Sequence, residues 1–209
     1  MIDLSLYLVT DRALCLGRDV LTIVEESVKG GVSVVQLREK ECSFREMYDL
    51  ALKLKDMLSL YKIPLIINDR VDIALTVGAD GVHLGQSDMH PNQAREILGE
   101  RAIIGLSVES MEQVEEANNL DVNYLAISPV FATPTKTDTV TEWGIEGIKK
   151  VRNYTKHRLV AIGGINAANA EEIIKAGADG IAVVSAICSA EYPRKSAEQL
   201  RRYILPHLS

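Results

Sequence analysis

The sequence predicts an α/β protein with a single-domain (β/α)8 barrel, the TIM-barrel fold, over residues 1–209. Three observations lead to this prediction. Short apolar segments recur eight times along the chain, segments with helical periodicity separate them, and one four-residue motif recurs four units later. Eight consecutive strand–helix units favour a closed parallel barrel over an open sheet.

The eight predicted strands are nearly continuous runs of aliphatic residues. Parallel strands that are covered on both faces show this pattern, because neither face needs polar side chains. The runs lie at residues 4–10, 32–37, 63–67, 81–84, 102–106, 124–127, 159–162 and 180–184.

Apolar residues recur at helical spacing between these strands. Met47, Ala51 and Leu54 belong to one such stripe, which is typical of a helix packed on a sheet. Pro91 suits the first turn of the fourth helix. Ser110, followed three residues later by a glutamine, resembles a capping box that opens the fifth helix.

The motif Gly-Ala-Asp-Gly occurs at residues 78–81 and again at 177–180, before the fourth and the eighth strand. Its glycines can adopt the left-handed conformation that ends a helix and turns the chain into the next strand. Because both copies precede strands, we interpret them as structural rather than catalytic.

Composition excludes several classes of function. With a net charge of −6, the chain has no overall attraction for nucleic acid or anionic membranes, so an anionic ligand would need a local cluster of cations. Cys15, Cys42 and Cys188 are odd in number and widely spaced, which favours a reducing compartment. The first residues contain no signal peptide or membrane span. We therefore expect a cytoplasmic protein.

Polar residues follow most of the predicted strands. Barrel enzymes place their active sites where strands end and loops begin, so these residues are candidates for one site. They are Gln36, Arg38, Lys40, Asn68, Asp69, Gln86, Asp88, Ser107, Thr133, Thr135, Lys136, Gly163, Gly164, Val184 and Ser185. Such a rim would suit a site that binds phosphorylated substrates, because it combines cations, carboxylates, hydroxyls and accessible backbone amides.

A phosphate site is predicted after the last two strands. Gly163 and Gly164 would let backbone N–H groups approach an anion, and a helix beginning near Ser185 would point its positive end at the same place. A tight Gly-Gly turn without a ligand is the alternative for the glycines.

Asp69 and Asp88 follow adjacent strands, and Mg²⁺ commonly takes one or two carboxylates together with water and substrate phosphate oxygens. An ordinary ion pair, such as Asp69 with Arg38, is the alternative. His83 is interpreted as a core histidine whose polar atoms are satisfied, not as a catalyst.

The chain resembles the thiamine-phosphate synthase family in stretches that follow one another over nearly the whole sequence. They are Tyr-Leu-Val-Thr-Asp at 7–11, Gln-Leu-Arg-Glu-Lys at 36–40, Ile-Asn-Asp-Arg at 67–70, Gly-Val-His-Leu-Gly-Gln-Ser-Asp at 81–88, Pro-Val-Phe at 129–131 with Thr133, Thr135 and Lys136, Ile-Gly-Gly-Ile at 162–165, and Val-Val-Ser-Ala-Ile at 183–187.

This resemblance implies a transferase of thiamine biosynthesis that acts on two small molecules. A 4-amino-2-methylpyrimidine with a methylene diphosphate would lose diphosphate, and the nitrogen of 4-methyl-5-(2-phosphooxyethyl)thiazole would attack the methylene to give thiamine phosphate. No base or nucleophile is needed, because the nitrogen has a free lone pair.

The resemblance also implies a role for each site residue. Arg38, Lys40, Lys136 and Ser107 would be catalytic. The pyrimidine diphosphate would bind to Gln36, Arg38, Lys40, Asn68, Ser107 and Lys136. The thiazole phosphate would bind to Thr133, Thr135, Gly164, Val184 and Ser185. Asp69 and Asp88 would hold Mg²⁺ as the cofactor.

Two related functions remain as alternatives. A thiazole tautomerase or a non-catalytic thiazole-phosphate-binding paralogue would need the phosphate site but not the diphosphate apparatus, so Arg38, Lys40, Asp69, Asp88 and Lys136 favour the synthase. The fold alone does not exclude another phosphate-handling barrel enzyme, such as a phosphosugar isomerase. No nucleic-acid or membrane partner is expected, and a homo-oligomer is compatible with the sequence.

The longest irregular stretch, residues 129–142, follows the sixth strand and carries several threonines and Lys136. Its length and position predict a lid over the bound diphosphate. A solvated strand is the alternative for its alternating threonines.

Overall fold

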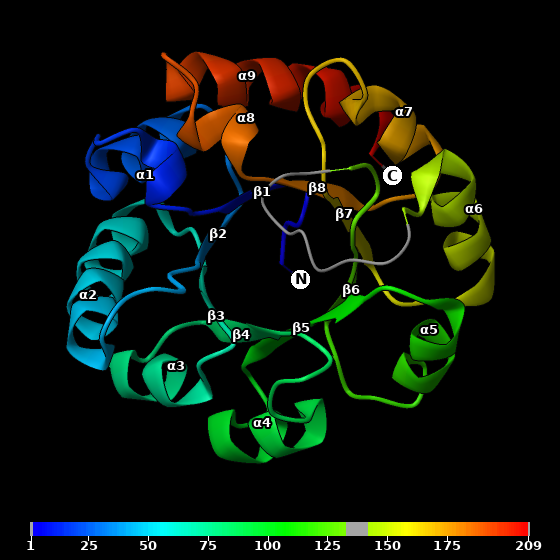
Figure 1. Cartoon of the computed structure of the whole chain (residues 1–209), viewed down its shortest axis with the longest axis horizontal. Helices are drawn as coiled ribbons and strands as arrows, with labels where there is room; N and C mark the ends of the chain where they lie inside the picture. The colour runs from blue at the N-terminus through cyan, green and yellow to red at the C-terminus, as the bar shows by residue number, and fades with distance from the viewer. Residues whose placement is uncertain (1, 133–141, 209) are drawn as a thin grey trace.

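A computed structural model describes residues 2–132 and 142–208, and it contains the predicted barrel (Figure 1). Eight parallel strands pair in chain order, and the last pairs with the first to close the barrel. The strands are β1 (Leu6–Val9), β2 (Val34–Leu37), β3 (Leu65–Asn68), β4 (Gly81–Leu84), β5 (Ile103–Val108), β6 (Tyr124–Ile127), β7 (Leu159–Ile162) and β8 (Gly180–Val183). The predicted fold class is confirmed.

Helices connect the strands and surround the barrel (Figure 1). They are α1 (Val20–Lys29), α2 (Phe44–Tyr61), α3 (Val71–Val77), α4 (Pro91–Leu98), α5 (Met111–Ala117), α6 (Gly144–Tyr154), α7 (Ala170–Lys175), α8 (Ser185–Cys188) and α9 (Pro193–Ile204), with short 3-10 helices at Ala13–Cys15 and Leu205–His207.

The predicted bounds of β1, β2, β3, β5 and β8 differ from the observed ones by one or two residues, and the capping box predicted for α5 does not form. The fifth strand continues to Val108, because the backbone N–H of Ser128 donates to the Val108 carbonyl and prolongs the pairing with β6, so Ser107 lies within the strand. At α5, Ser110 caps the helix, but the Gln113 side chain accepts from the Glu109 N–H, so no capping box forms. A complete capping box opens α2 instead, at Ser43.

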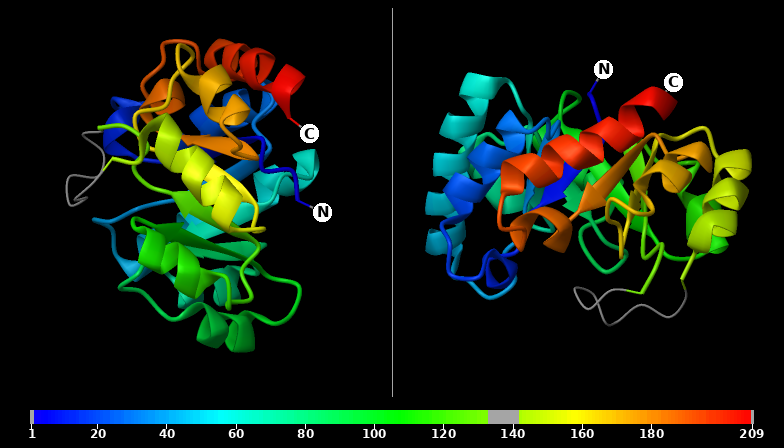
Figure 2. Two further views of the ribbon diagram at one scale, coloured as in Figure 1. Left: turned by 90° about the vertical axis from the view of Figure 1, so that its right-hand side faces the viewer. Right: turned by 90° about the horizontal axis from the view of Figure 1, so that it is seen from above.

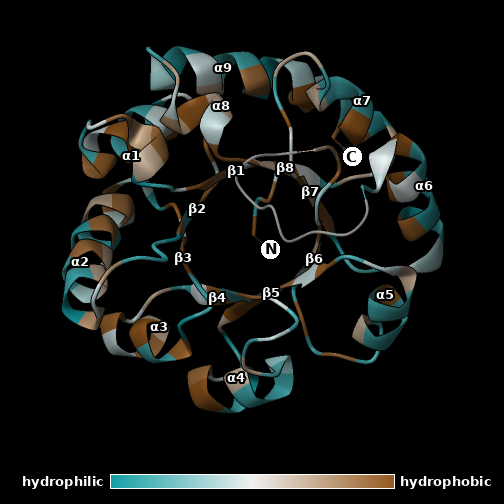
Figure 3. Cartoon of the chain, viewed as in Figure 1, coloured by the Kyte–Doolittle hydropathy of each residue, from teal (hydrophilic) through white to brown (hydrophobic). Residues whose placement is uncertain are grey.

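The hydrophobic core has two layers, one between the strands and the helices and one inside the barrel. Leu8, Val35 and Ile67 belong to the outer layer, whereas Tyr7, Val34 and Ile66 lie inside, because neighbouring residues of a strand point to opposite faces. Figure 3 shows mostly hydrophobic strands in the barrel wall and helices that carry both kinds of surface. The strands are therefore buried on both faces, as their composition predicts.

The two Gly-Ala-Asp-Gly motifs join neighbouring strands at the end of the barrel where the strands begin. Asp80 Oδ2 accepts from the backbone N–H of Leu65, at the start of β3, and from Lys55 of α2 at 2.8 Å. Asp179 Oδ2 accepts in the same way from the N–H of Leu159 and from Arg152 of α6. Each aspartate thus ties a helix to two strands, and both chain termini lie at this end (Figure 2).

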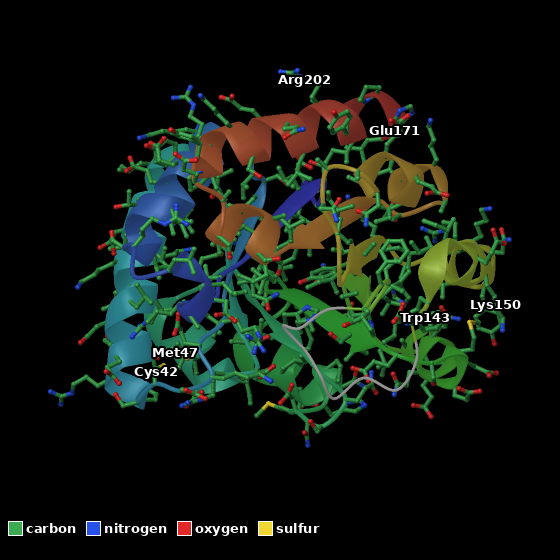
Figure 4. The ribbon with its side chains drawn as sticks, turned by 45° about the horizontal axis from the view of Figure 1, so that its top comes forward. Cys42, Met47, Trp143, Lys150, Glu171 and Arg202 are labelled. Carbon is green, nitrogen blue, oxygen red and sulfur yellow. The ribbon has the colours of Figure 1, made fainter. Side chains whose placement is uncertain are left out.

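The outer surface carries many charged side chains together with single exposed apolar residues such as Leu16 and Leu60. Charged side chains such as Lys150 and Arg202 point away from the barrel (Figure 4) and are exposed. Within residues 2–132 and 142–208, no helix combines the length and apolarity required to cross a membrane.

Candidate active site

A cavity of about 350 Å³ opens at the end of the barrel where the strands finish. Twelve of the fifteen candidate residues line it, and they are Gln36, Arg38, Lys40, Asn68, Asp69, Gln86, Asp88, Ser107, Gly163, Gly164, Val184 and Ser185. The structure therefore brings these twelve residues together. Thr133, Thr135 and Lys136, with most of the predicted lid, lie outside the described residues.

The cationic side of the cavity follows β2. The backbone N–H of Arg38 donates to the Thr10 hydroxyl, and its guanidinium lies 3.3 Å from the carboxylate of Asp11. Residues of the loop after β1 thus hold Arg38 in place. Its ion pair is with Asp11 and not, as in the alternative, with Asp69. Lys40, two residues further along, is exposed at the same rim.

Asp69 and Asp88 form the acidic side of the cavity. Asp69 has a φ of 62°, a conformation that aspartate tolerates better than most residues, and its N–H donates to the His83 carbonyl. Asp88 Oδ2 accepts from the N–H of Gly85 at 2.7 Å. Burial, followed by the interaction with Asp88, raises the pKa of Asp69 to about 6, against the opposing effect of Lys40. The two carboxylates thus repel each other in a partly buried place.

These carboxylates fit a divalent cation. A bound cation would offset the burial and the repulsion that together raise the pKa of Asp69. Two carboxylates also leave coordination positions open for water and phosphate oxygens, as Mg²⁺ prefers. The described part of the chain holds no group of three His, Cys, Asp or Glu side chains suited to a metal.

Two glycines lie on the opposite side of the cavity, together with the start of α8. Gly163 and Gly164 have φ values of 106° and 65° after β7. A Cβ on Gly164 would lie 2.8 Å from the Cβ of Phe131, so glycine is required by conformation and by contact with the segment after β6. Val184 and Ser185 begin α8, which is only four residues long. The expected contribution of a helix dipole to anion binding is therefore small.

The cavity floor contains polar residues that sequence reasoning did not assign to the site. Tyr7, His83 and Tyr124 line it together with Gln36 and Ser107. His83 is buried and its ring nitrogens bond to Tyr124 and Ser107, as expected of a satisfied core histidine. No pattern in the sequence marks the tyrosines, because β1 and β6 are buried on both faces and show no alternation between inward and outward positions.

Apolar side chains complete the floor. They come from several strands and are Val9, Ala126, Val160, Ile162 and Ala182. Gln86, after β4, donates to the Ser107 carbonyl at 2.5 Å and closes one edge. The cavity thus offers an apolar surface for flat rings between an acidic and cationic side and a side of backbone amides.

Comparison with known proteins agrees with this arrangement. Residues 6–187 match the thiamine monophosphate synthase family. A thiamine-phosphate synthase of Albidiferax ferrireducens is 54% identical over 201 residues, which cover 96% of this chain and 92% of that protein. One from Leptospira biflexa is 52% identical over 201 residues, with 94% and 96% covered.

Solved structures agree as well. Thiamine phosphate pyrophosphorylase from Pyrococcus furiosus superimposes with a TM-score of 0.90 and 40% identity over 99% of this chain and 98% of that one. A 3-hexulose-6-phosphate synthase, with a TM-score of 0.72 and 16% identity over 96% and 99% of the two chains, shares the fold alone. The sequence matches over nearly the full length show that this chain belongs to the thiamine monophosphate synthase family.

Proposed function

We propose that the protein is a thiamine-phosphate synthase, a transferase that joins the pyrimidine diphosphate to the thiazole phosphate and releases diphosphate. One observation carries the proposal. A single cavity combines an acidic and cationic side, a floor of apolar and hydrogen-bonded polar side chains, and a side that contains Gly164, Val184 and Ser185, which provides for two phosphorylated rings at once. A thiazole tautomerase would have no use for the first of these sides.

The diphosphate would bind at the rim after β2 to β5. Arg38, already oriented by Asp11, and Lys40 supply positive charge toward the departing diphosphate. Asp69 and Asp88 would hold Mg²⁺, which when bound neutralises charge on the diphosphate oxygens. Gln36, Asn68 and Ser107 would bind the same substrate, and we assign Lys136 here from the resemblance alone.

The thiazole phosphate would bind at the turn after β7 and the start of α8. Gly164, Val184 and Ser185 line this side of the cavity, where backbone amides can donate to an anion. Thr133 and Thr135 are assigned to this substrate by the resemblance.

The reaction needs positioning more than acid–base chemistry. The aminopyrimidine can stabilise a cation on its methylene as the C–O bond to diphosphate breaks, and the thiazole nitrogen forms the new C–N bond with its own lone pair. The residues of the cavity therefore hold two rings in line and stabilise the leaving group. This accounts for a site in which His83 is engaged with neighbouring side chains.

We further infer that the protein works in the cytoplasm on small molecules. Its three cysteines are free thiols, which suits a reducing compartment. The acidic net charge gives no support to a nucleic-acid or membrane partner. Assembly into a homo-oligomer stays a prediction from the sequence.

An assay with purified protein, both substrates and Mg²⁺ tests the proposal. Thiamine phosphate and diphosphate should form in equal amounts, and only when both substrates are present. Folded protein that yields neither product but isomerises the thiazole carboxylate phosphate would instead be a tautomerase. Binding of the thiazole phosphate without any turnover would indicate the non-catalytic paralogue.

A further inference from the structure

A continuous chain of hydrogen bonds crosses the floor of the cavity. Gln36 Nε2 lies 2.9 Å from the Tyr7 hydroxyl, which lies 2.9 Å from the Tyr124 hydroxyl. The Tyr124 hydroxyl lies 3.0 Å from His83 Nδ1, and His83 Nε2 lies 2.9 Å from Ser107 Oγ. Five strands supply these side chains, so the chain links β2 to β5 through the barrel interior.

The amide nitrogen of Gln36 can only donate, so Tyr7 accepts from it. The other hydrogen bond of the Tyr7 hydroxyl joins it to Tyr124, and we infer that Tyr7 is the donor there, because only this order gives the proton of each tyrosine an acceptor within the chain of hydrogen bonds. Tyr124 in turn donates to Nδ1 of His83. A neutral imidazole whose Nδ1 accepts carries its proton on Nε2, and this N–H donates to Ser107 Oγ.

Burial keeps both tyrosines protonated. Tyr7 and Tyr124 are 1% and 0% exposed, and this burial raises the pKa of Tyr7 and Tyr124 well above the ordinary value of a phenol. Each hydroxyl therefore has one proton to donate, and the order of donors along the chain is maintained.

The packing holds these rings in place. The His83 ring stacks on the Tyr124 ring with centroids 5.6 Å apart. Gly105, between them on β5, is required by the same contacts, because a Cβ there would lie 2.6 Å from His83 Nδ1 and closer still to Tyr124. The histidine consequently has little freedom to turn away from Ser107.

We propose that His83 is a positioning residue that fixes Ser107 as a hydrogen-bond donor toward the cavity. Because Ser107 Oγ accepts from His83, its own proton is left to donate to a bound anion. A donor oriented before the substrate arrives needs no rearrangement when negative charge grows on the leaving diphosphate. The inference rests on the proposed function, in which Ser107 contacts the pyrimidine diphosphate.

The first test measures the tautomer of His83 in the isolated protein. Long-range ¹H–¹⁵N correlation spectra distinguish the two ring nitrogens, and His83→Gln identifies the signals by their loss. We expect a proton on Nε2 and none on Nδ1. A proton on Nδ1 would overturn the inference. Because this spectrum requires no turnover, it judges the inference even if the assay for thiamine phosphate fails.

The second test compares two buried hydroxyls. Tyr124→Phe removes the donor to Nδ1, so we expect a mixture of His83 tautomers and a kcat lowered on the order of two- to tenfold, with the KM for the thiazole phosphate nearly unchanged. Thr155→Val is the matched control, because Thr155 is 5% exposed and bonds to Asn118 away from the cavity. Equal kcat values for both variants would contradict the inference.

The third test asks whether the effect passes through Ser107. In a Ser107→Ala background, Tyr124→Phe should lower kcat no further, because the hydroxyl that it positions is already absent. Fully additive losses from the two substitutions would show that the tyrosine acts by another route and would refute the positioning role.

Discussion

Aspartates at the two ends of the barrel have opposite electrostatic surroundings. Where the strands begin, Asp80 and Asp179 each bind a cation and a backbone N–H. Where the strands end, Asp69 faces Asp88, and burial together with this like charge raises the pKa of Asp69 to about 6. Where the strands begin, Asp80 and Asp179 are paired with cations of the protein. Where the strands end, the two neighbouring carboxylates leave negative charge that a bound cation can offset. The difference separates residues that stabilise the fold from residues available for chemistry.

The largest expected effect is on turnover at the rim. Asp69→Asn and Asp88→Asn each remove a proposed Mg²⁺ ligand, so we expect kcat/KM to fall by about 100-fold or more, beyond the roughly 10- to 100-fold typical of residues that only support a ligand. Steady-state kinetics over a range of Mg²⁺ concentrations measure this. Asp80→Asn, at the opposite end, is the control and should keep near wild-type kinetics. Wild-type rates in excess chelator would exclude the metal role.

The next effect separates the two anion sites. Arg38→Ala should weaken the pyrimidine diphosphate on the order of 10- to 100-fold, because a charge-assisted contact is worth about 1.5–3 kcal/mol. It should leave the thiazole phosphate nearly unaffected. Ser185→Ala should do the reverse and only by a few-fold, since the backbone amides remain. Calorimetry with each ligand decides, and equal losses for both ligands would contradict this division.

The smallest effects are on stability, and they should have opposite signs. Asp80→Asn loses the partly exposed ion pair with Lys55, so the free energy of unfolding should fall by about 1 kcal/mol. Asp69→Asn removes a carboxylate whose folded-state pKa is raised, so it should stabilise the metal-free protein by on the order of 1 kcal/mol.

The effect of Asp69 on the free energy of unfolding should depend on pH. A carboxyl whose pKa is higher in the folded state destabilises the fold when both states are ionised, above about pH 6, and this penalty vanishes as the pH falls below the unfolded value. The gain from Asp69→Asn should therefore be present at pH 8 and absent near pH 3.5. Urea unfolding at both pH values measures it, and a loss of stability at pH 8 would show that the pKa of Asp69 is not raised in the folded protein.

The sequence predicts the barrel and the rim better than the floor. The strands at 81–84, 124–127 and 159–162 match β4, β6 and β7 residue for residue, because aliphatic runs between turns mark buried parallel strands. Rim residues such as Asp69 can be found because they directly follow strands. Tyr7 and Tyr124 could not, because strands buried on both faces show no alternation that distinguishes inward from outward positions.

Contacts between distant segments could also not be predicted from the sequence. Asp80 was expected to sit in a structural turn, but its bond to the first residue of β3 depends on the register between strands. In the same way, the pairing of Arg38 with Asp11 depends on where the loop after β1 passes. Such contacts require the closed barrel before they can be seen.

The most direct test of the contrast between the two ends is binding of Mg²⁺ in the presence of diphosphate, measured by calorimetry. We predict saturable binding to the wild-type protein, retained in Asp80→Asn and lost in Asp69→Asn and Asp88→Asn. Equal binding to all four proteins would show that the rim carboxylates do not hold the metal and would contradict the account.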